Sequence, residues 1–135
     1  MSLLDSNNCI IIGIDFQEKL VNMLDRGEVA VKFEKLLQAA KILNLPTILT
    51  EQYPQGLGAT IFDTKDLTVL EKRSFSAMQE AYFREQLTKS GKKQIIIGGI
   101  ETHICVHQTV AELLNVGYEV FVDRKSTRLN SSHVR

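Results

Sequence analysis

Short β-branched runs alternate with longer amphipathic segments along this chain, and no other feature restricts its fold as strongly. Residues 9–15, CIIIGID, are almost entirely apolar, which is typical of a strand buried on both faces. Residues 28–43 carry apolar side chains at helical spacing. Strands that alternate with helices of this length predict a doubly wound, Rossmann-like α/β fold, in which helices cover both faces of a parallel sheet.

The same alternation continues through the rest of the chain. The glycine- and proline-containing segment 53–60 is predicted to be an irregular loop. Phe75 and Phe83 are predicted to lie in the core. The other predicted elements are strands at 45–52, 67–72, 93–99 and 118–122, and helices at 76–91 and 102–117.

The last residues depart from this pattern. Residues 123–135, DRKSTRLNSSHVR, have no apolar period and are rich in Ser, Asn and Arg, which is typical of disorder. A doubly wound sheet that stops after residue 122 also leaves an edge and a helix face uncovered. We therefore expect one domain over residues 1–122 that lacks its last strand and helix. The segment 123–135 is atypical and resembles translated adaptor sequence.

Charge and composition narrow the classes of partner. Sixteen basic and sixteen acidic residues cancel, which argues against a bulk electrostatic surface for nucleic acid or membrane. No apolar run approaches a membrane span, and the first residues lack the features of a signal peptide. Cys9 and Cys105 do not resemble a disulfide framework. The expected compartment is the cytoplasm, and no nucleic-acid or membrane partner is expected.

Three chemically active side chains are predicted to meet at one edge of the sheet. Ligands of open α/β sheets bind outside the carboxyl ends of the strands. Asp15 ends the first strand, Lys72 ends the strand 67–72, and Cys105 follows the strand 93–99. At the first turn of a helix, Cys105 would experience a field that favours the thiolate, and free backbone N–H groups there could hold an oxyanion. Asp15 could then act as its base, and Lys72 could stabilise either group.

Simpler interpretations stay open for each of these residues. Free cysteines are often small buried apolar residues, so Cys105 could serve packing alone. A strand-terminal aspartate such as Asp15 is often a cap or turn former, and a lysine such as Lys72 is most often a solvated surface charge.

The pattern His103, Cys105, His107 raises the possibility of a metal site. Histidines four residues apart share a helix face, but a cysteine two residues along points elsewhere, so the three could not chelate one ion from a regular helix. We therefore expect no metal. The same geometry disfavours His103 as a base for Cys105.

Four segments together resemble a known family: IIGIDFQEKL, LPTILTEQYPQGLG, LEKRSFSAM and IIIGGIETHICVHQTVAELLNVGYEVFV. This set is similar to the isochorismatase-like cysteine hydrolases, and most similar to the isochorismatase domain-containing group, over residues 5–122. The resemblance implies an Asp–Lys–Cys triad of Asp15, Lys72 and Cys105. In such a triad the cysteine attacks a small amide or related C–N substrate and forms an acyl-enzyme. The aspartate acts as base and then as acid, and the lysine orients it.

The resemblance has further implications for the site. It implies a cis peptide at Ile100–Glu101 and an oxyanion hole made by the backbone amides of Glu101 and Cys105. It implies no cofactor, and no metal either, because TEQYPQ lacks the histidine found in the nicotinamidase-type metal site. Family members are commonly dimers or larger, so a homo-oligomer is expected.

Contacts to a small-molecule substrate are expected from four residues near the strand ends: Phe16, Gln17, Gln52 and Tyr53. Two other classes of function remain as alternatives. One is a catalytically vestigial α/β domain that binds a small molecule or a partner. The other is a redox-sensing thiol protein, which the absence of a nearby resolving cysteine disfavours.

Overall fold

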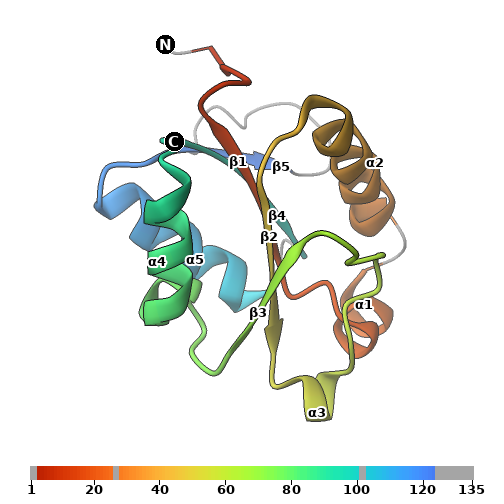
Figure 1. Ribbon diagram of the computed structural model, residues 1–135. Coiled ribbons are helices and arrows are strands. Elements are labelled where there is room, and N and C mark those ends of the chain that lie inside the picture. Colours follow the sequence, from red (N-terminus) through yellow and green to blue (C-terminus); the bar gives the residue numbers. More distant parts are fainter. Residues whose placement is uncertain (1–2, 26–27, 101–102, 124–135) are drawn as a thin grey trace.

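The computed structural model describes residues 3–25, 28–100 and 103–123. Five parallel strands form one sheet in the order β3-β2-β1-β4-β5, with helices on both faces (Figure 1). The predicted doubly wound α/β fold is therefore confirmed. The strands are β1 (Cys9–Ile14), β2 (Thr47–Gln52), β3 (Thr68–Lys72), β4 (Gln94–Gly99) and β5 (Glu119–Asp123). The helices are α1 (Glu18–Leu24), α2 (Glu28–Leu43), α3 (Pro54–Leu57), the 3-10 turn η1 (Ala77–Gln79), α4 (Ala81–Ser90) and α5 (Ile104–Asn115).

The elements differ from the sequence prediction in a few places. The short helix α1 was not predicted, and α3 lies inside the segment predicted to be irregular. The helix predicted at 76–91 is divided into η1 and α4, and α5 begins at Ile104 instead of residue 102. The shift at α5 matters for the site, because it places His103 before the helix.

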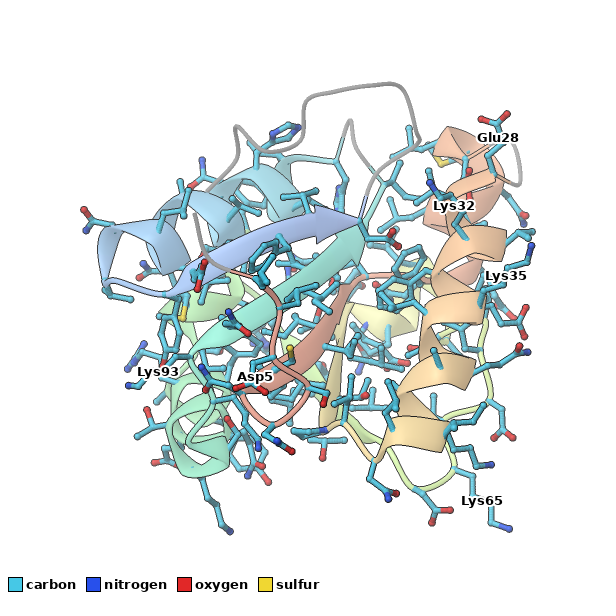
Figure 2. All side chains as sticks on the ribbon, turned by 90° about the horizontal axis from the view of Figure 1, so that it is seen from above. Asp5, Glu28, Lys32, Lys35, Lys65 and Lys93 are labelled. Carbon is cyan, nitrogen blue, oxygen red and sulfur yellow. The ribbon has the colours of Figure 1, made fainter. Side chains whose placement is uncertain are left out.

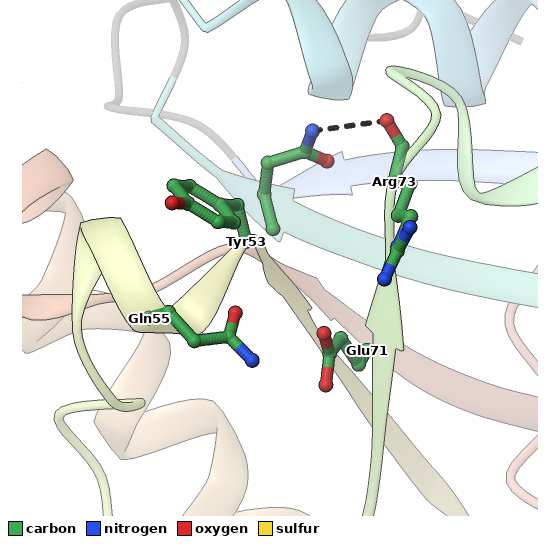
Figure 3. Close-up of a pocket in the computed structure, with 5 residues that line it drawn as sticks. Tyr53, Gln55, Glu71 and Arg73 are labelled. Carbon is green, nitrogen blue, oxygen red and sulfur yellow. Dashed lines mark hydrogen bonds between the residues drawn. The ribbon is translucent and has the colours of Figure 1, made fainter.

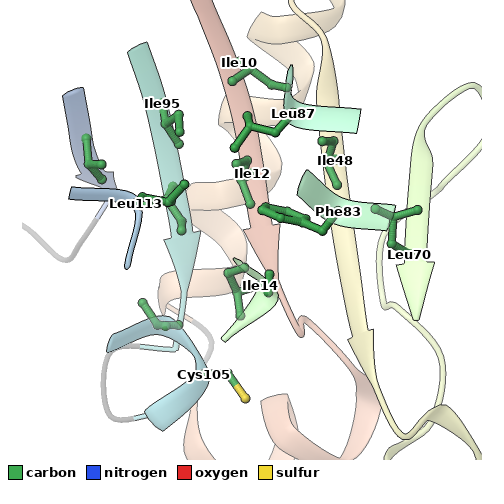
Figure 4. Packing of buried hydrophobic residues seen from close by; sticks show 14 residues of the cluster. Ile10, Ile12, Ile14, Ile48, Leu70, Phe83, Leu87, Ile95, Cys105 and Leu113 are labelled. Carbon is green, nitrogen blue, oxygen red and sulfur yellow. The ribbon is translucent and has the colours of Figure 1, made fainter. Parts of the chain in front are cut away.

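Side chains that alternate along β1 build two separate cores. On one face, Ile10, Ile12 and Ile14 pack with Phe83 of α4 and Leu113 of α5 (Figure 4). On the other face, residues from the same strands pack against α2. Each large apolar side chain that is fully buried contributes about 1.5–3 kcal/mol to folding, so the sheet is well anchored on both sides. Cys105 lies at the end of the first core that is nearest the carboxyl ends of the strands (Figure 4).

An aromatic ring packs against two glycines on neighbouring strands of the sheet. Gly13 of β1 and Gly98 of β4 lie side by side in register. A Cβ at these positions would lie 2.8 Å and 2.4 Å from ring atoms of Phe33, which is too close for a real side chain. The ring of Phe16 stacks on Phe33 with centroids 4.6 Å apart. This packing fixes the segment just after β1, where Asp15 lies.

The surface agrees with the neutral composition. Labelled side chains of both charge signs project outward around the molecule (Figure 2). Phe83 is buried as predicted, but the prediction for Phe75 was wrong, because its side chain is 56% exposed. Among the residues that the structure describes, no helix is long and apolar enough to cross a membrane.

Candidate active site

Asp15 is held at the carboxyl end of β1 by its own backbone and by its neighbour on β2. Its φ of 55° lies in the left-handed region, which is uncommon outside glycine and is often found at functional sites. The backbone N–H of Asp15 donates to the carbonyl oxygen of Thr50 at 3.2 Å. The Thr50 hydroxyl donates to Asp15 Oδ1 at 2.6 Å. The carboxyl group is 0% exposed, so its partners are the groups that decide its charge.

Lys72 is a buried cation with a full set of acceptors. Its Nζ lies 3.1 Å from Asp15 Oδ2 and 2.7 Å from Gln52 Oε1. It also donates to the carbonyl oxygens of Ser74 and Phe75, each at 3.0 Å. A buried ammonium is tolerated only when it is paired and hydrogen-bonded, and this arrangement meets both conditions. The interpretation of Lys72 as a solvated surface charge is therefore wrong.

The turn that supplies two of these acceptors is itself fixed by an acidic side chain. Glu80 accepts hydrogen bonds from the backbone N–H groups of Arg73 and Ser74 at 2.9 and 3.0 Å. These two hydrogen bonds outweigh partial burial and lower the pKa of the Glu80 carboxyl. The negative charge of Glu80 thus stabilises the turn that surrounds the Lys72 ammonium.

Cys105 lies in the first turn of α5, directly against the end of β4. A Cβ at Gly99 would lie 2.4 Å from Val106 Cγ2, so glycine is what allows α5 to approach the strand this closely. The Thr109 hydroxyl donates to the carbonyl oxygen of Cys105 at 2.7 Å. The Sγ of Cys105 lies within 4.8 Å of a carboxylate oxygen of Asp15, and Lys72 Nζ lies 3.1 Å from Asp15 Oδ2. The three residues predicted to converge do lie together.

The protonation states differ from the sequence prediction in one respect. Burial and the charge of Asp15 raise the pKa of the Cys105 thiol to about 11, although Lys72 acts in the opposite direction. Cys105 is therefore a neutral thiol at pH 7, and the expectation of a resting thiolate was wrong. A thiolate here would be a second buried anion beside Asp15, which disfavours the charged form.

The pKa of Asp15 is shifted in the opposite direction to that of Cys105. Burial alone would raise the pKa of its carboxyl, but the hydrogen bond from His103, the charge of Lys72 and the hydrogen bond from Thr50 outweigh burial and lower it. The resting site thus contains a carboxylate, an ammonium and a thiol. A single proton transfer from Cys105 to Asp15 would generate the nucleophile, which is how a cysteine is activated by an adjacent base.

His103 is a part of this site that sequence reasoning missed. Its Nε2 lies 3.0 Å from Asp15 Oδ2, and its side chain is 11% exposed. The residue occupies the N-cap of α5, with φ −81° and ψ 125°, and is not in the helix itself. Placing the helix start at residue 102 put His103 on the wrong side of the helix. Histidine is not a preferred N-cap residue, so no sequence signal would have indicated this position.

The arrangement bears on metal binding as well. Asp15, His103 and Cys105 place ligand atoms within 4.8 Å of one another, the one such group among the described residues. His103 and Cys105 lie closer together than expected for two residues in one helix, because His103 is at the N-cap, whereas His107, the third member of the predicted pattern, is not part of this group. However, the Lys72 ammonium lies 3.1 Å from the same Asp15 oxygen and would repel a cation. The arrangement is suited to holding and transferring a proton.

A pocket opens beside the buried cluster, at the carboxyl ends of β2 and β3 (Figure 3). Its volume is about 380 Å³. Gln52 connects the pocket to the cluster, because its Oε1 accepts from Lys72 and its Nε2 donates to the carbonyl oxygen of Arg73 at 3.2 Å. The lining residues are Gln52, Tyr53, Gln55, Glu71 and Arg73. Gln52 and Tyr53, two of the predicted substrate contacts, thus line this open surface pocket.

The other two predicted substrate contacts, Phe16 and Gln17, are buried and have a structural role. Phe16 is 2% exposed and belongs to the aromatic cluster on the α2 face. Gln17 is 0% exposed, and both ends of its amide bond the backbone: Oε1 accepts from Gln52 N–H at 2.8 Å, and Nε2 donates to Gly58 O at 2.8 Å. Both side chains hold the loop after β2 and do not line the pocket. Glu101 lies outside the described residues, so the predicted cis peptide and oxyanion hole stay predictions.

Comparison with known proteins identifies the family. A family model for the isochorismatase domain matches residues 9–128, so this chain belongs to the isochorismatase domain family. The resemblance seen in the four sequence segments is thereby confirmed.

Individual relatives agree with this assignment. Isochorismatase domain-containing protein 1 of Salmo salar is 37% identical over 109 residues, which is 78% of this chain and 38% of that protein. The structure of MAR1 ribonuclease from Caenorhabditis elegans is similar with a TM-score of 0.80 and 35% identity, over 90% of this chain and 65% of that one. The YcaC gene product of Escherichia coli is described as an octameric hydrolase of unknown specificity. Its structure is similar with a TM-score of 0.81 and 27% identity, over 88% of this chain and 63% of that one. The chain thus spans less than two thirds of each relative.

Proposed function

We propose that this chain is a cysteine hydrolase that cleaves a small amide or related C–N bond through an acyl-enzyme on Cys105. The observation that carries the proposal is a buried carboxylate and ammonium, 3.1 Å apart, with the Cys105 Sγ within 4.8 Å of the same carboxylate group. Membership of the isochorismatase domain family and likeness to a protein described as a hydrolase support it.

In the proposed mechanism, Asp15 handles one proton in each half-reaction. As Cys105 Sγ bonds the carbonyl carbon, its proton moves to Asp15, which then donates that proton to the leaving nitrogen as the C–N bond breaks. Water next attacks the thioester and gives a proton to Asp15. That proton returns to sulfur as the C–S bond breaks. Lys72 holds the carboxylate throughout, and backbone amides of Glu101 and Cys105 would stabilise the oxyanion.

The proposed substrate is a small polar molecule, and no cofactor is needed for this chemistry. The cavity of about 380 Å³ lies within the range of small-ligand pockets, about 300–1,000 Å³. Glu71 and Arg73 provide both charge signs at its wall, and Tyr53 provides an aromatic face (Figure 3). Gln52 would couple an occupant of this cavity to Lys72.

Acyl-enzyme formation tests the proposal directly. Incubation with a panel of small aliphatic, aromatic and heteroaromatic primary amides is expected to release ammonia and, after an acid quench, to leave an acyl group on the peptide that contains Cys105. Cys105→Ala should reduce turnover at least about 10³-fold, because the covalent route depends on the thiol. Cys9→Ala is the matched control, since Cys9 is equally buried but lies at the opposite edge of the sheet.

Two outcomes would count against an amide hydrolase. Turnover that survives Cys105→Ala would exclude the acyl-enzyme. Absence of acylation both by the amides and by the reactive donor p-nitrophenyl acetate would favour a vestigial binding domain. Because the Caenorhabditis elegans relative is named a ribonuclease, an RNA oligonucleotide belongs in the same panel. Its cleavage is not expected of a chain whose charges cancel.

Self-association is also part of the proposal, because the Escherichia coli relative is described as octameric. Light scattering of the purified chain is expected to give a mass of at least two copies, each of 15.2 kDa. A mass of one copy at micromolar concentration would contradict it. Cytoplasmic localisation likewise stays a prediction.

A further inference from the structure

Asp15 Oδ2 is shared between two nitrogen groups from different parts of the chain. Lys72 Nζ, at the end of β3, lies 3.1 Å away, and His103 Nε2, just before α5, lies 3.0 Å away. The second carboxylate oxygen, Oδ1, accepts from the Thr50 hydroxyl. A carboxylate can only accept hydrogen bonds, so Nε2 of His103 must carry the shared hydrogen. His103 is therefore a donor to the proposed base.

The backbone places His103 for this contact. Its N–H donates to the carbonyl oxygen of Ile100 at 2.8 Å, and its own carbonyl oxygen accepts from Val106 N–H at 3.1 Å. Its extended N-cap conformation turns the side chain away from the helix and toward the end of β1. It is also more exposed than its partners, at 11% against 1% or less for the side chains of Lys72 and Asp15.

We propose that His103 is a positioning residue for Asp15, whose hydrogen bond keeps the carboxylate ionised and oriented to receive the Cys105 proton. This rests on the proposed function only in giving Asp15 the role of base. Without the imidazole, Lys72 alone would hold Oδ2, and burial would favour the neutral acid, which cannot accept the thiol proton.

The effect of His103 can be tested separately, because among the residues that the structure describes only a few groups face Asp15. They are Thr50 from β2, Lys72 from β3, and His103 and Cys105 from the start of α5. The hydrogen bond from His103 is the largest contribution that opposes the effect of burial on the pKa of Asp15. Its loss should therefore raise that pKa, while Lys72 and Thr50 remain in place.

Two substitutions at one position separate the hydrogen bond from mere packing. His103→Ala removes the donor, and His103→Gln places an amide N–H close to the position of Nε2. His103→Ala is expected to lower amide turnover at neutral pH by about 10- to 100-fold, the usual effect of losing one hydrogen bond to a charged group. It should also move the acid limb of the pH–rate profile to higher pH. His103→Gln should restore most of the rate and leave the acid limb near that of the parent chain.

A second measurement needs no substrate. The side-chain carboxyl ¹³C signal of Asp15, identified by its loss in Asp15→Asn, should titrate at higher pH in His103→Ala and near the parent midpoint in His103→Gln. Unchanged titration in a folded His103→Ala variant would overturn the proposal, as would equal effects of both substitutions. If the midpoint moves but no amide is hydrolysed, the positioning role stands and the proposed function fails.

Discussion

Asp15→Asn is expected to reduce amide turnover by about 10²- to 10⁴-fold and, at the same time, to make Cys105 easier to alkylate at neutral pH. An amide side chain cannot take the thiol proton, and loss of a general base typically costs about 10²- to 10⁴-fold in rate. The pKa of Cys105 is raised to about 11 by burial first and by the charge of Asp15 second. Removing that charge should lower the pKa, so more thiolate is present at pH 7.

The two effects are measured separately, by steady-state turnover of an amide and by the rate of iodoacetamide addition to Cys105 at pH 7.5. Asp63→Asn is a suitable control, because Asp63 is an exposed aspartate that is not part of the cluster. Slower alkylation in Asp15→Asn than in the parent chain would mean that Asp15 already holds the proton of a resting thiolate. That outcome would contradict the assigned protonation states.

Lys72→Met is expected to be the most destabilising substitution in the site. It leaves the Asp15 carboxylate buried without its nearest cation, and breaking a buried ion pair in this way costs about 3–5 kcal/mol. It should also raise the pKa of Cys105 further, since Lys72 lowers it in the parent chain. Urea unfolding at pH 7 measures the stability, and Lys35→Met, at an exposed position on α2, is the matched control.

The double variant Asp15→Asn/Lys72→Met tests the electrostatic origin of this effect. Replacing both charges removes the uncompensated carboxylate, so the double variant should be more stable than Lys72→Met alone. Acidification of the parent chain, followed by its free energy of unfolding, provides a second test of the same electrostatic effect. The partners of Asp15 lower its pKa, so its contribution to stability is present above the usual aspartate pKa and is lost as pH falls through the lower, folded-state value. Equal stability of the double and single variants would indicate that Lys72 acts through packing.

The part of the site that could be predicted from the sequence is the set of residues at the ends of the strands. Asp15 and Lys72 end parallel strands, and Cys105 follows another, so a parallel sheet necessarily brings them to one edge. What the residues could not provide was the distance between the charges. Burial and the charge of Asp15 raise the pKa of Cys105 and Lys72 lowers it, and the balance depends on the packed geometry.

The residues whose locations were wrongly predicted also show that tertiary contacts cannot be read from local sequence. Phe75 and Phe83 have the same residue type and lie near each other in sequence, but only Phe83 meets the sheet, because it lies within α4 and Phe75 lies in a turn. Gln17 was expected at the substrate, yet its amide is fully used on the loop backbone. Such tertiary hydrogen bonds leave no local sequence pattern.

The pH dependence of Cys105 alkylation in the parent chain tests the central claim most directly. Iodoacetamide addition should be followed by peptide mapping, so that Cys9 is counted separately. A neutral thiol beside an ionised Asp15 predicts that the rate rises with a midpoint near pH 11, well above the usual value of about 8.5 for cysteine. A midpoint well below 8.5 would show a resting thiolate and contradict the proposed proton transfer from Cys105 to Asp15.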